Sequence, residues 1–222
     1  MNRFAPLACT INGTVDPPDY VNSLVPGPRK YSDVVVKGPE TLIVSNSITK
    51  GINKKDINER YDGDGQLSFR RFPGAKTEDV RAYLPTNLSK TKPETVIIQT
   101  GGNDLPTPRS NPVPVEVIAK TIVECGLLCK SYGVKNVLIS GIPIRRPYYM
   151  QTRCKELNLL LQEHCRNEGF TFIDNGNIDL SHTYDGTHLT QEGSALLRDN
   201  YLLELNALFW EDVRSKCPKS QS

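Results

Sequence analysis

The chain has 222 residues, a formal net charge of +2 and hydrophobic residues at 37% of its positions. A chain of this length buries one core well, and no segment approaches the roughly 20 consecutive apolar residues of a membrane-spanning helix. The near balance of charge argues against a protein dedicated to nucleic-acid binding, although it leaves room for a local basic patch. The composition therefore indicates a single globular domain, which we assign to residues 39–214.

The two ends of the chain differ from this domain. Residues 1–38 contain five prolines and no sustained apolar period, which predicts a poorly ordered tail or linker, compatible with a longer protein upstream. Residues 215–222 are predicted to be a C-terminal tail. The first residues lack the long apolar stretch of a secretory signal, so we expect a cytoplasmic protein.

The cysteines support the same location. They occur without CxxC pairs, which favours buried thiols in a reducing compartment over a disulfide or zinc framework. The six positions are Cys9, Cys125, Cys129, Cys154, Cys165 and Cys217.

From Glu40 onward, short apolar runs alternate with segments of helical periodicity. The runs predict strands at 41–44, 67–72, 95–99, 136–140 and 171–173. Strands separated by helices of ten or more residues are typical of βαβ crossovers and a parallel sheet. The sequence therefore predicts an α/β fold with three layers, in which helices cover both faces of a five-stranded sheet.

Capping and stop signals outline four helices. Thr77 is predicted to cap the first, which begins with two acidic residues. The second opens at Pro112 and Pro114 and ends at Gly133, the third covers 150–167, and the fourth runs from Gln191 to about residue 213. Their buried faces are predicted to hold Val117, Ile118, Ile122 and Cys125 in the second helix, Leu157, Leu160, Leu161 and Cys165 in the third, and Leu197, Tyr201, Leu205, Leu208 and Phe209 in the fourth.

Polar clusters occur just after four of these elements, where a parallel sheet binds its ligands. Ser47 follows the first strand, residues 72–75 follow the second, residues 101–104 follow the third, and residues 185–188 precede the last helix. In open parallel sheets, ligands bind outside the carboxyl ends of the strands. We therefore expect these four clusters to converge at one edge of the sheet.

The residue types in the clusters fit acyl transfer from an ester. Ser47 can act as the nucleophile, His188 as the base that takes its proton, and Asp185 as the group that orients the imidazole. The backbone N–H groups of Ser47 and Gly74 and the side-chain amide of Asn103 can stabilise the oxyanion. This assignment requires no metal and no cofactor.

These residues resemble the four signature positions of the SGNH hydrolases, also called the GDSL esterase/lipase superfamily. "IVSNSIT" is similar to the nucleophile block, "FPGAKTEDV" to the glycine block, "IIQTGGNDL" to the GxND block and "YDGTHLTQEG" to the DxxH block. One block alone is a weak signal, but four in the family's order are a strong one. The resemblance covers about residues 40–210. It implies a flavodoxin-like sheet and metal-free hydrolysis of acetyl, short acyl or lipid esters through an acyl-enzyme.

The residues within and before these blocks show a narrower resemblance. "RRFPGAKTEDVRAYLP", "VIIQTGGNDLP" and the preceding "YSDVVVKG" are similar to the esterase domain in the first open reading frame of LINE-type retrotransposons. This resemblance implies that nucleic-acid or membrane association resides in other segments of a wider protein. The sequence does not indicate the oligomeric state.

The nucleophile block departs from the family pattern of Gly-Asp-Ser. Ser45 replaces the glycine and strains the chain if that position needs a positive φ. Asn46 replaces the aspartate, which removes a carboxylate but keeps an acceptor oxygen beside Ser47. Asn46 and Asp104 are expected to hold the catalytic residues in position without contacting the substrate. An active serine esterase, at full or reduced rate, is the leading interpretation, and an attenuated or inactive module of the same fold that binds lipid, protein or RNA is the alternative.

Each site residue also has an ordinary structural explanation. Ser47 suits a turn, Gly74 suits the turn after Pro73, Asn103 suits an Asx-turn, and His188 suits a helix cap. Their joint position at one sheet edge favours the catalytic interpretation.

Other chemistries fit the sequence less well. Zinc bound by His182, Asp185 and His188 would leave Ser47 without a role. The segment 145–149 follows the fourth strand and suits either a contact to a substrate headgroup or phosphate or an exposed loop. Gly101 and its neighbouring glycine are followed by no Lys-Ser/Thr pair, which argues against a nucleotide-binding loop.

Overall fold

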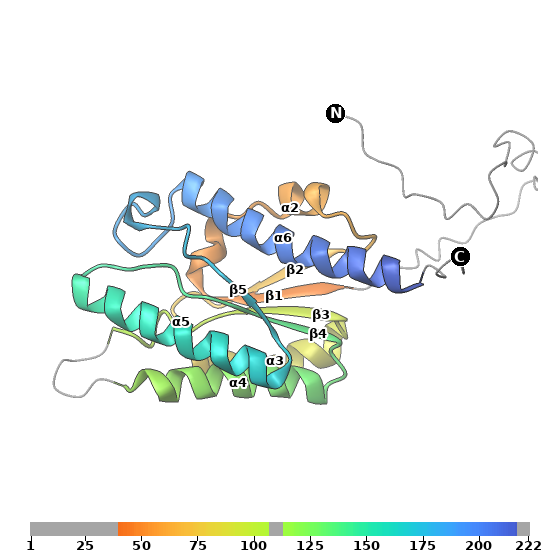
Figure 1. Ribbon diagram of the computed structural model, residues 1–222, viewed down its shortest axis with the longest axis horizontal. Helices are drawn as coiled ribbons and strands as arrows, with labels where there is room; N and C mark the ends of the chain where they lie inside the picture. Colours follow the sequence, from red (N-terminus) through yellow and green to blue (C-terminus); the bar gives the residue numbers. More distant parts are fainter. Residues whose placement is uncertain (1–39, 107–112, 217–222) are drawn as a thin grey trace, which may run out of the picture. The chain divides into compact units, whose positions relative to one another are not determined.

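The computed structural model describes residues 40–106 and 113–216, so most of both predicted tails lies outside the described residues. All five predicted strands are present within one residue of their expected ends, and all pair in parallel. Their order is β2-β1-β3-β4-β5 (Figure 1). This order is that of flavodoxin-like sheets, and it confirms the predicted fold class. The strands are β1 (Thr41–Ser45), β2 (Leu67–Arg71), β3 (Thr95–Gln99), β4 (Asn136–Ser140) and β5 (Thr171–Ile173).

The four predicted helices are also present, and shorter elements join them that the periodicity did not predict. The predicted helices are α3 (Thr77–Thr91), α4 (Val115–Ser131), α5 (Tyr148–Glu168) and α6 (Gln191–Lys216). The additional elements are the 3₁₀ helices η1 (Ser47–Gly51) and η2 (Leu180–His182) and the short helix α2 (Lys54–Arg60). One compact unit ends at Trp210 and contains every strand.

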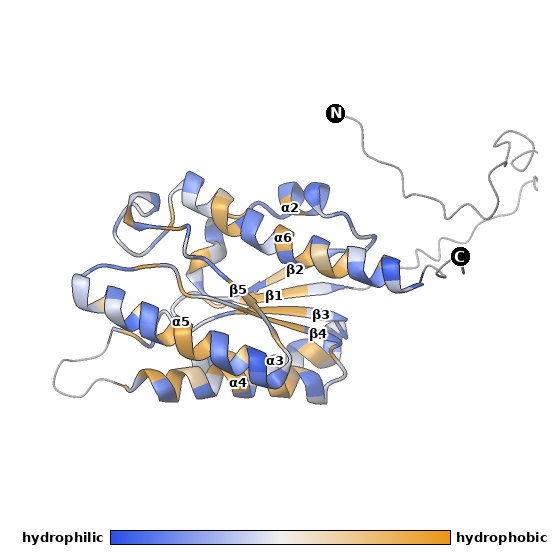
Figure 2. Cartoon of the chain, in the orientation of Figure 1, coloured by the Kyte–Doolittle hydropathy of each residue, from blue (hydrophilic) through white to orange (hydrophobic). Residues whose placement is uncertain are grey.

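The central strands are apolar along their whole length because helices cover both faces of the sheet. In Figure 1, α3, α4 and α5 lie below the sheet, and α2 and α6 lie above it. Successive strand residues point to opposite faces, so Leu42 and Val44 pack against α3 and α4, whereas Ile43 packs against α2 and α6. Figure 2 shows hydrophobic strands between helices in which hydrophilic and hydrophobic residues alternate.

Two predictions about the helices were wrong in detail. Thr77 is the first residue of α3, not its N-cap, which is Lys76. Val117 was predicted to lie on the buried face of α4, but its side chain is 51% exposed, whereas Ile118 and Ile122 are buried. The helical repeat explains this, since Val117 lies about 100° around the axis from Ile118 and therefore leaves the buried stripe.

The prediction of buried thiols is confirmed for the four cysteines in the described residues. Cys125, Cys129, Cys154 and Cys165 are all free and buried. Burial raises the pKa of Cys154 to about 11 and those of the other three thiols to about 12. Cys9 and Cys217 lie outside the described residues. None of the helices in the described part of the chain combines the length and apolar character needed to cross a membrane.

The sheet order determines where a site can form. Helices α5 and α6 begin at the left end of Figure 1 and run antiparallel to the strands, so the carboxyl edge of the sheet lies at that end. The crossover after β1 leads outward to β2, and the crossover after β3 leads in the opposite direction to β4, which makes the β1/β3 junction the switch point of the sheet. Ligands bind at such junctions because the loops diverge there and leave a crevice.

Candidate active site

Ser47 lies directly after β1, on the first turn of η1. The side chain of Asn46 caps this turn, since its Oδ1 accepts a hydrogen bond from the backbone N–H of Ile48 at 3.1 Å. The backbone N–H of Ser47 donates to no acceptor in the described residues. The turn therefore presents both the hydroxyl and the amide of Ser47 at the carboxyl edge of the sheet.

His188 lies within hydrogen-bonding distance of Ser47, although 141 positions separate them in the sequence. Its Nε2 is 3.3 Å from Ser47 Oγ, and its Nδ1 is 2.7 Å from Asp185 Oδ2. An ionised carboxylate only accepts hydrogen bonds, so Nδ1 carries the proton and Nε2 of the neutral ring faces the serine hydroxyl as an acceptor. The three predicted residues are thus brought together in the order serine, imidazole, carboxylate.

The Asp185–His188 turn is held from several sides. Asp185 Oδ1 accepts hydrogen bonds from the backbone N–H groups of Thr187 at 2.9 Å and His188 at 2.7 Å. The hydrogen bond from the His188 side chain, followed by that from its backbone, lowers the pKa of Asp185 to about 2. Tyr184 closes the turn by donating its N–H to the carbonyl of His188 at 3.0 Å, and its ring stacks on the imidazole with centroids 5.8 Å apart.

Gly74 lies in a tight turn after β2. Ala75 N–H donates to the carbonyl of Phe72 at 3.1 Å, and Gly74 has a φ of +79°. Pro73 precedes it, so the turn has the proline that a type II turn favours and the positive-φ glycine that it requires. The N–H of Gly74 has no acceptor within the described segments.

Asn103 links this glycine turn to the loop after β3. Its Nδ2 donates to the carbonyl of Ala75 at 2.9 Å, which fixes the amide next to Gly74. A side-chain amide has two N–H groups, so the second remains available to a ligand. The Gly101–Asp104 turn, closed by an N–H to carbonyl hydrogen bond of 3.1 Å, holds Asn103 in position.

Asp104 supports the site through α3. Its carboxylate accepts hydrogen bonds from Thr77 N–H at 3.1 Å and Thr77 Oγ1 at 2.9 Å, so it satisfies the first turn of α3 that Thr77 was predicted to cap. Burial raises the pKa of this carboxyl group. Asp104 thereby ties the loop of Asn103 to the helix that follows Gly74.

Ser45 and Asn46, the two departures from the family pattern, are accommodated differently. Ser45 is the last residue of β1, and its φ is not positive, so the strain considered from the sequence does not arise. Its buried Oγ lies 2.6 Å from Thr49 Oγ1. Asn46 is 1% exposed, and its Nδ2 has no hydrogen-bonding partner in the described residues. An unsatisfied buried donor costs about 1–3 kcal/mol.

The zinc alternative has no geometric support. His182 Nδ1 is 3.0 Å from Asp179 Oδ1, so its ring is engaged with η2. Within residues 40–106 and 113–216, no three His, Cys, Asp or Glu side chains form a group that can hold a metal ion.

The segment 145–149 divides into one buried residue and four exposed ones. Arg145 is only 5% exposed, and its Nη1 donates to the carbonyl of Gly102 at 2.9 Å. The exposed-loop interpretation is therefore wrong for Arg145, and the headgroup contact stays a prediction. Nothing in the local sequence distinguished it from Arg146, which is exposed.

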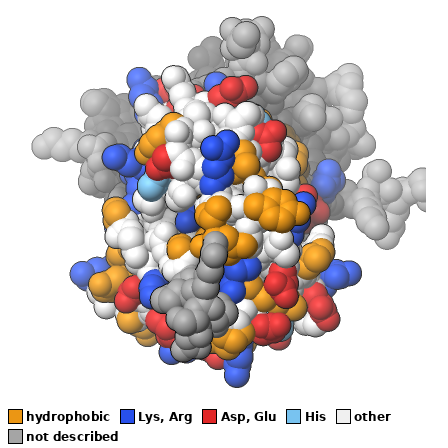
Figure 3. Space-filling model, turned by 90° about the vertical axis from the view of Figure 1, so that its left-hand side faces the viewer, with side chains coloured by type: hydrophobic (Ala, Val, Ile, Leu, Met, Phe, Trp, Pro, Cys, Tyr) orange, Lys and Arg blue, Asp and Glu red, His pale blue; other side chains and the backbone are white. Residues whose placement is uncertain are grey.

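Figure 3 views the molecule onto the carboxyl edge of the sheet. A histidine side chain reaches this surface beside an acidic side chain, and hydrophobic and basic side chains gather near the centre of the face.

Several solved structures share the fold of this chain. The crystal structure of a catalytic mutant of an acetylxylan esterase from Geobacillus stearothermophilus is 15% identical, with a TM-score of 0.65, over 76% of this chain and 94% of that one. A lipase/acylhydrolase from Enterococcus faecalis is 23% identical, with a TM-score of 0.64, over 77% and 96%. A GDSL-like lipase from Bacteroides thetaiotaomicron is 16% identical, with a TM-score of 0.63, over 76% and 88%. At these identities the likeness shows the fold. No curated protein sequence matches the chain.

The family profile described as GDSL-like Lipase/Acylhydrolase matches residues 47–196, which is most of the chain. The matched range begins at Ser47 and contains Gly74, Asn103 and the Asp185–His188 turn. The chain therefore belongs to the GDSL-like lipase/acylhydrolase family of carboxylic ester hydrolases.

Proposed function

We propose that this protein is a serine esterase that removes acetyl or other short acyl groups from carboxylic esters through an acyl-enzyme. The observation that carries the proposal is the hydrogen-bonded series of Ser47 Oγ, His188 Nε2, His188 Nδ1 and Asp185 Oδ2, with separations of 3.3 and 2.7 Å. In this series the carboxylate of Asp185 orients the imidazole, and Nε2 of the imidazole is placed to accept the proton of Ser47.

In the first half of the reaction, Ser47 Oγ attacks the ester carbonyl carbon while its proton passes to His188 Nε2. The carbonyl oxygen becomes an oxyanion, which the N–H groups of Ser47 and Gly74 and the free N–H of Asn103 stabilise. When the tetrahedral intermediate collapses, the bond to the alcohol oxygen breaks, and His188 donates its proton to that oxygen. Asp185 remains ionised and stabilises the imidazolium.

In the second half, water replaces the alcohol. His188 Nε2 takes a proton from water as the water oxygen attacks the acyl carbon of the Ser47 ester. Collapse of the second intermediate breaks the bond to Ser47 Oγ, which regains its proton from His188. The carboxylic acid leaves, and the enzyme returns to its starting state.

Short acyl esters are the substrates to test first. The Geobacillus neighbour is described as an acetylxylan esterase, and the Enterococcus neighbour as a lipase/acylhydrolase. An ester panel should therefore compare acetyl, butyryl and longer acyl groups on one chromogenic alcohol, and then acetylated xylo-oligosaccharides and lipid esters.

The decisive experiment measures hydrolysis of p-nitrophenyl acetate by purified protein and by Ser47→Ala and His188→Ala. We expect either substitution to remove nearly all activity, since loss of a triad member typically costs about 10⁴-fold or more. Matched controls are Ser131→Ala and His164→Ala, which change the same residue types on α4 and α5 and should retain the wild-type rate. Unchanged hydrolysis in Ser47→Ala would refute the proposal.

The orphaned amide of Asn46 is the one observation that favours the alternative of an attenuated module. A fluorophosphonate probe distinguishes the two, because it labels only an activated serine. Labelling that is lost in Ser47→Ala supports the esterase, and absence of labelling in folded protein supports the inert module. A large gain of labelling rate in Asn46→Asp would show that Asn46 slows the site.

We also propose a setting for the enzyme. Residues 39–214 would form the esterase domain between the tails 1–38 and 215–222, in the cytoplasm, within a retrotransposon-encoded protein whose other segments contact nucleic acid or membrane. The wording of the sequence blocks and the four buried free thiols support this setting. A coiled coil or zinc knuckle encoded upstream in the same reading frame would strengthen it.

A further inference from the structure

Arg145 is a buried cation whose guanidinium lies against the loop of Asn103. It is 5% exposed, its Nη1 donates to the carbonyl of Gly102 at 2.9 Å, and its Nε has no hydrogen-bonding partner in the described residues. No carboxylate among these residues forms an ion pair with it. Asp185 attracts the guanidinium without pairing with it. Burying a charge that no ion pair offsets is costly, so a residue with this placement is poorly explained by stability alone.

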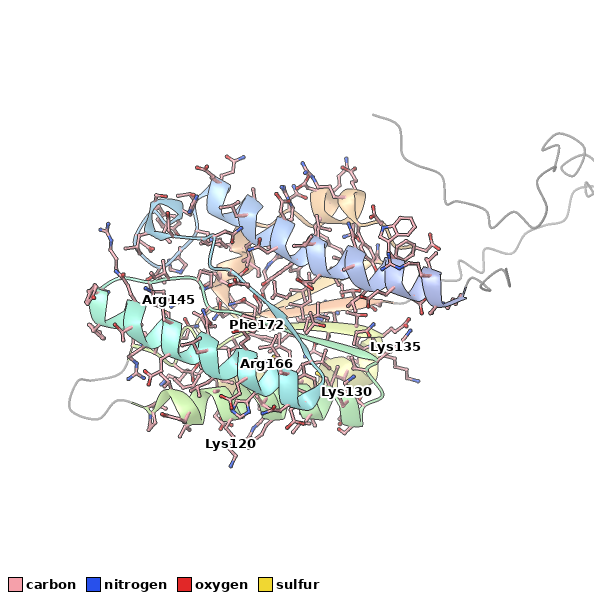
Figure 4. The ribbon with its side chains drawn as sticks, viewed as in Figure 1. Lys120, Lys130, Lys135, Arg145, Arg166 and Phe172 are labelled. Carbon is pink, nitrogen blue, oxygen red and sulfur yellow. The ribbon has the colours of Figure 1, made fainter. Side chains whose placement is uncertain are left out.

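Gly102 is shaped to receive this guanidinium. A Cβ added to Gly102 would lie 2.5 Å from Arg145 Nη2 and 2.7 Å from Cζ, which is closer than atoms can approach. The guanidinium therefore rests directly on the Cα of Gly102, and only glycine permits that contact. Figure 4 shows Arg145 near the beginning of α5, at the carboxyl edge of the sheet.

The hydrogen bond from Arg145 acts on the peptide unit that enters Asn103. The carbonyl of Gly102 belongs to the same planar peptide group as the backbone nitrogen of Asn103. A hydrogen bond that holds this oxygen in place therefore also sets the orientation of the Asn103 backbone. The far end of the Asn103 side chain is fixed by its hydrogen bond to Ala75. Asn103 is thus held at both ends, which leaves one N–H of its amide in a defined direction.

The next residue connects the same segment to the histidine turn. Arg146 N–H donates to the carbonyl of Gly186 at 2.8 Å, and the stem of the Arg146 side chain packs against Gly186. Gly186 lies between Asp185 and His188. Two consecutive residues after β4 therefore contact the loop of Asn103 on one side and the triad turn on the other.

We propose that Arg145 is a positioning residue, which aims the Asn103 amide at the oxyanion by holding the Gly102–Asn103 peptide. This inference rests on the proposed function. Because the guanidinium is buried and already bound to a backbone carbonyl, it is not placed to bind an anionic part of the substrate. Arg145 therefore acts on the rate of the chemical step rather than on substrate binding.

A double-mutant cycle tests this role. Arg145→Met removes the guanidinium, and we expect kcat to fall about 10- to 100-fold with KM within about twofold, because a misplacement of about 1 Å can cost 10²-fold in rate. Asn103→Ala should itself lower kcat by about 10²–10³-fold. In the Asn103→Ala background, adding Arg145→Met should then cost less than about threefold, because two residues that act through one interaction are not additive.

The matched control is Arg166→Met, which removes an exposed arginine at the other end of α5 and should leave kcat unchanged (Figure 4). A full loss from Arg145→Met in both backgrounds, or none in either, would overturn the positioning role. Activity that survives Ser47→Ala would instead overturn the proposed function, so the two failures are distinguishable.

Two further measurements guard against a general loss of folding. Arg145→Lys keeps the positive charge but loses the planar guanidinium group, and we expect its kcat to remain about tenfold below that of wild type. Adding guanidinium at about 20 mM should restore part of kcat in Arg145→Ala and have no effect on Arg166→Ala, since only the first leaves a cavity of that shape. Wild-type kcat in Arg145→Lys, or equal responses of the two alanine variants, would contradict the proposal.

Discussion

Replacement of Gly102 by alanine tests the geometry of the site without touching any reacting group. The new Cβ would lie 2.5 Å from Arg145 Nη2, and ordinary contact begins near 3.4 Å, so the guanidinium must retreat by about 0.9 Å. Its hydrogen bond to the Gly102 carbonyl would lengthen from 2.9 Å to beyond hydrogen-bonding distance. Gly102 does not have a positive φ, so backbone strain does not contribute.

Two quantities should change in Gly102→Ala. The loss of a charge-assisted hydrogen bond and the local overpacking together cost about 1–3 kcal/mol of unfolding free energy, offset by up to about 1 kcal/mol from the reduced freedom of the unfolded chain. We therefore expect a net destabilisation of about 0–3 kcal/mol, which lowers the Tm of a chain of this size by up to about 12 °C. The kcat for p-nitrophenyl acetate should fall about 10- to 100-fold.

The assay combines urea unfolding with steady-state kinetics at a temperature well below the Tm. Gly176→Ala is the control, because its new Cβ would meet only the flexible side chain of Asp174. In Gly102→Ala combined with Arg145→Ala the clash is absent, so kcat should be no lower than in Arg145→Ala alone. Wild-type kcat in Gly102→Ala, or fully additive losses in the double variant, would refute the reasoning.

The other predictions concern the triad, the thiols and the core. The pKa of Asp185 in the folded protein, about 2, lies below its ordinary value of 3.8, so its contribution to stability is present above about pH 4 and disappears as the pH falls through 2. Urea unfolding between pH 5 and pH 2 should therefore show a stability loss in wild type that Asp185→Asn lacks, and parallel curves would contradict this. Asp185→Asn should also lower kcat at pH 7 by about 10³–10⁴-fold, measured with p-nitrophenyl acetate. In a protein with Cys9→Ser and Cys217→Ser, Ellman's reagent at pH 8 should react only after unfolding, and rapid native reaction would contradict the raised thiol pKa values of Cys125, Cys129, Cys154 and Cys165. Ile43→Ala, at a position with no exposure, should lower the urea-derived unfolding free energy by about 2–5 kcal/mol, and a loss below 1 kcal/mol would contradict its place in the core.

Local sequence was sufficient for the elements of this fold. Leu42, Ile43 and Val44 form a continuous apolar run, which a strand adopts only when helices cover both faces of its sheet. Proline before α4 and glycine after α5 mark helix ends for reasons of backbone geometry that act within a few residues. These signals predicted the five strands and the four long helices, and the family resemblance supplied the order of the strands.

The same local signals did not determine which side chains meet. Asp104 caps α3 from 27 positions away, although the local sequence predicted Thr77 as the cap. Val117 has the same apolar character as Ile118, and only the direction in which α4 packs distinguishes them.

The candidate site divides in the same way. The sequence predicted Ser47, Gly74, Asn103 and His188 as site residues from their types and order. Acyl transfer needs those groups, and the carboxyl ends of parallel strands lie at one edge of the sheet. The burial of Arg145 against Gly102 was decided by tertiary structure alone, since the packing of α5 and the loop after β3 chooses which of two adjacent arginines turns inward. A local pattern specifies what a segment can form, and long-range packing specifies which atoms it then touches.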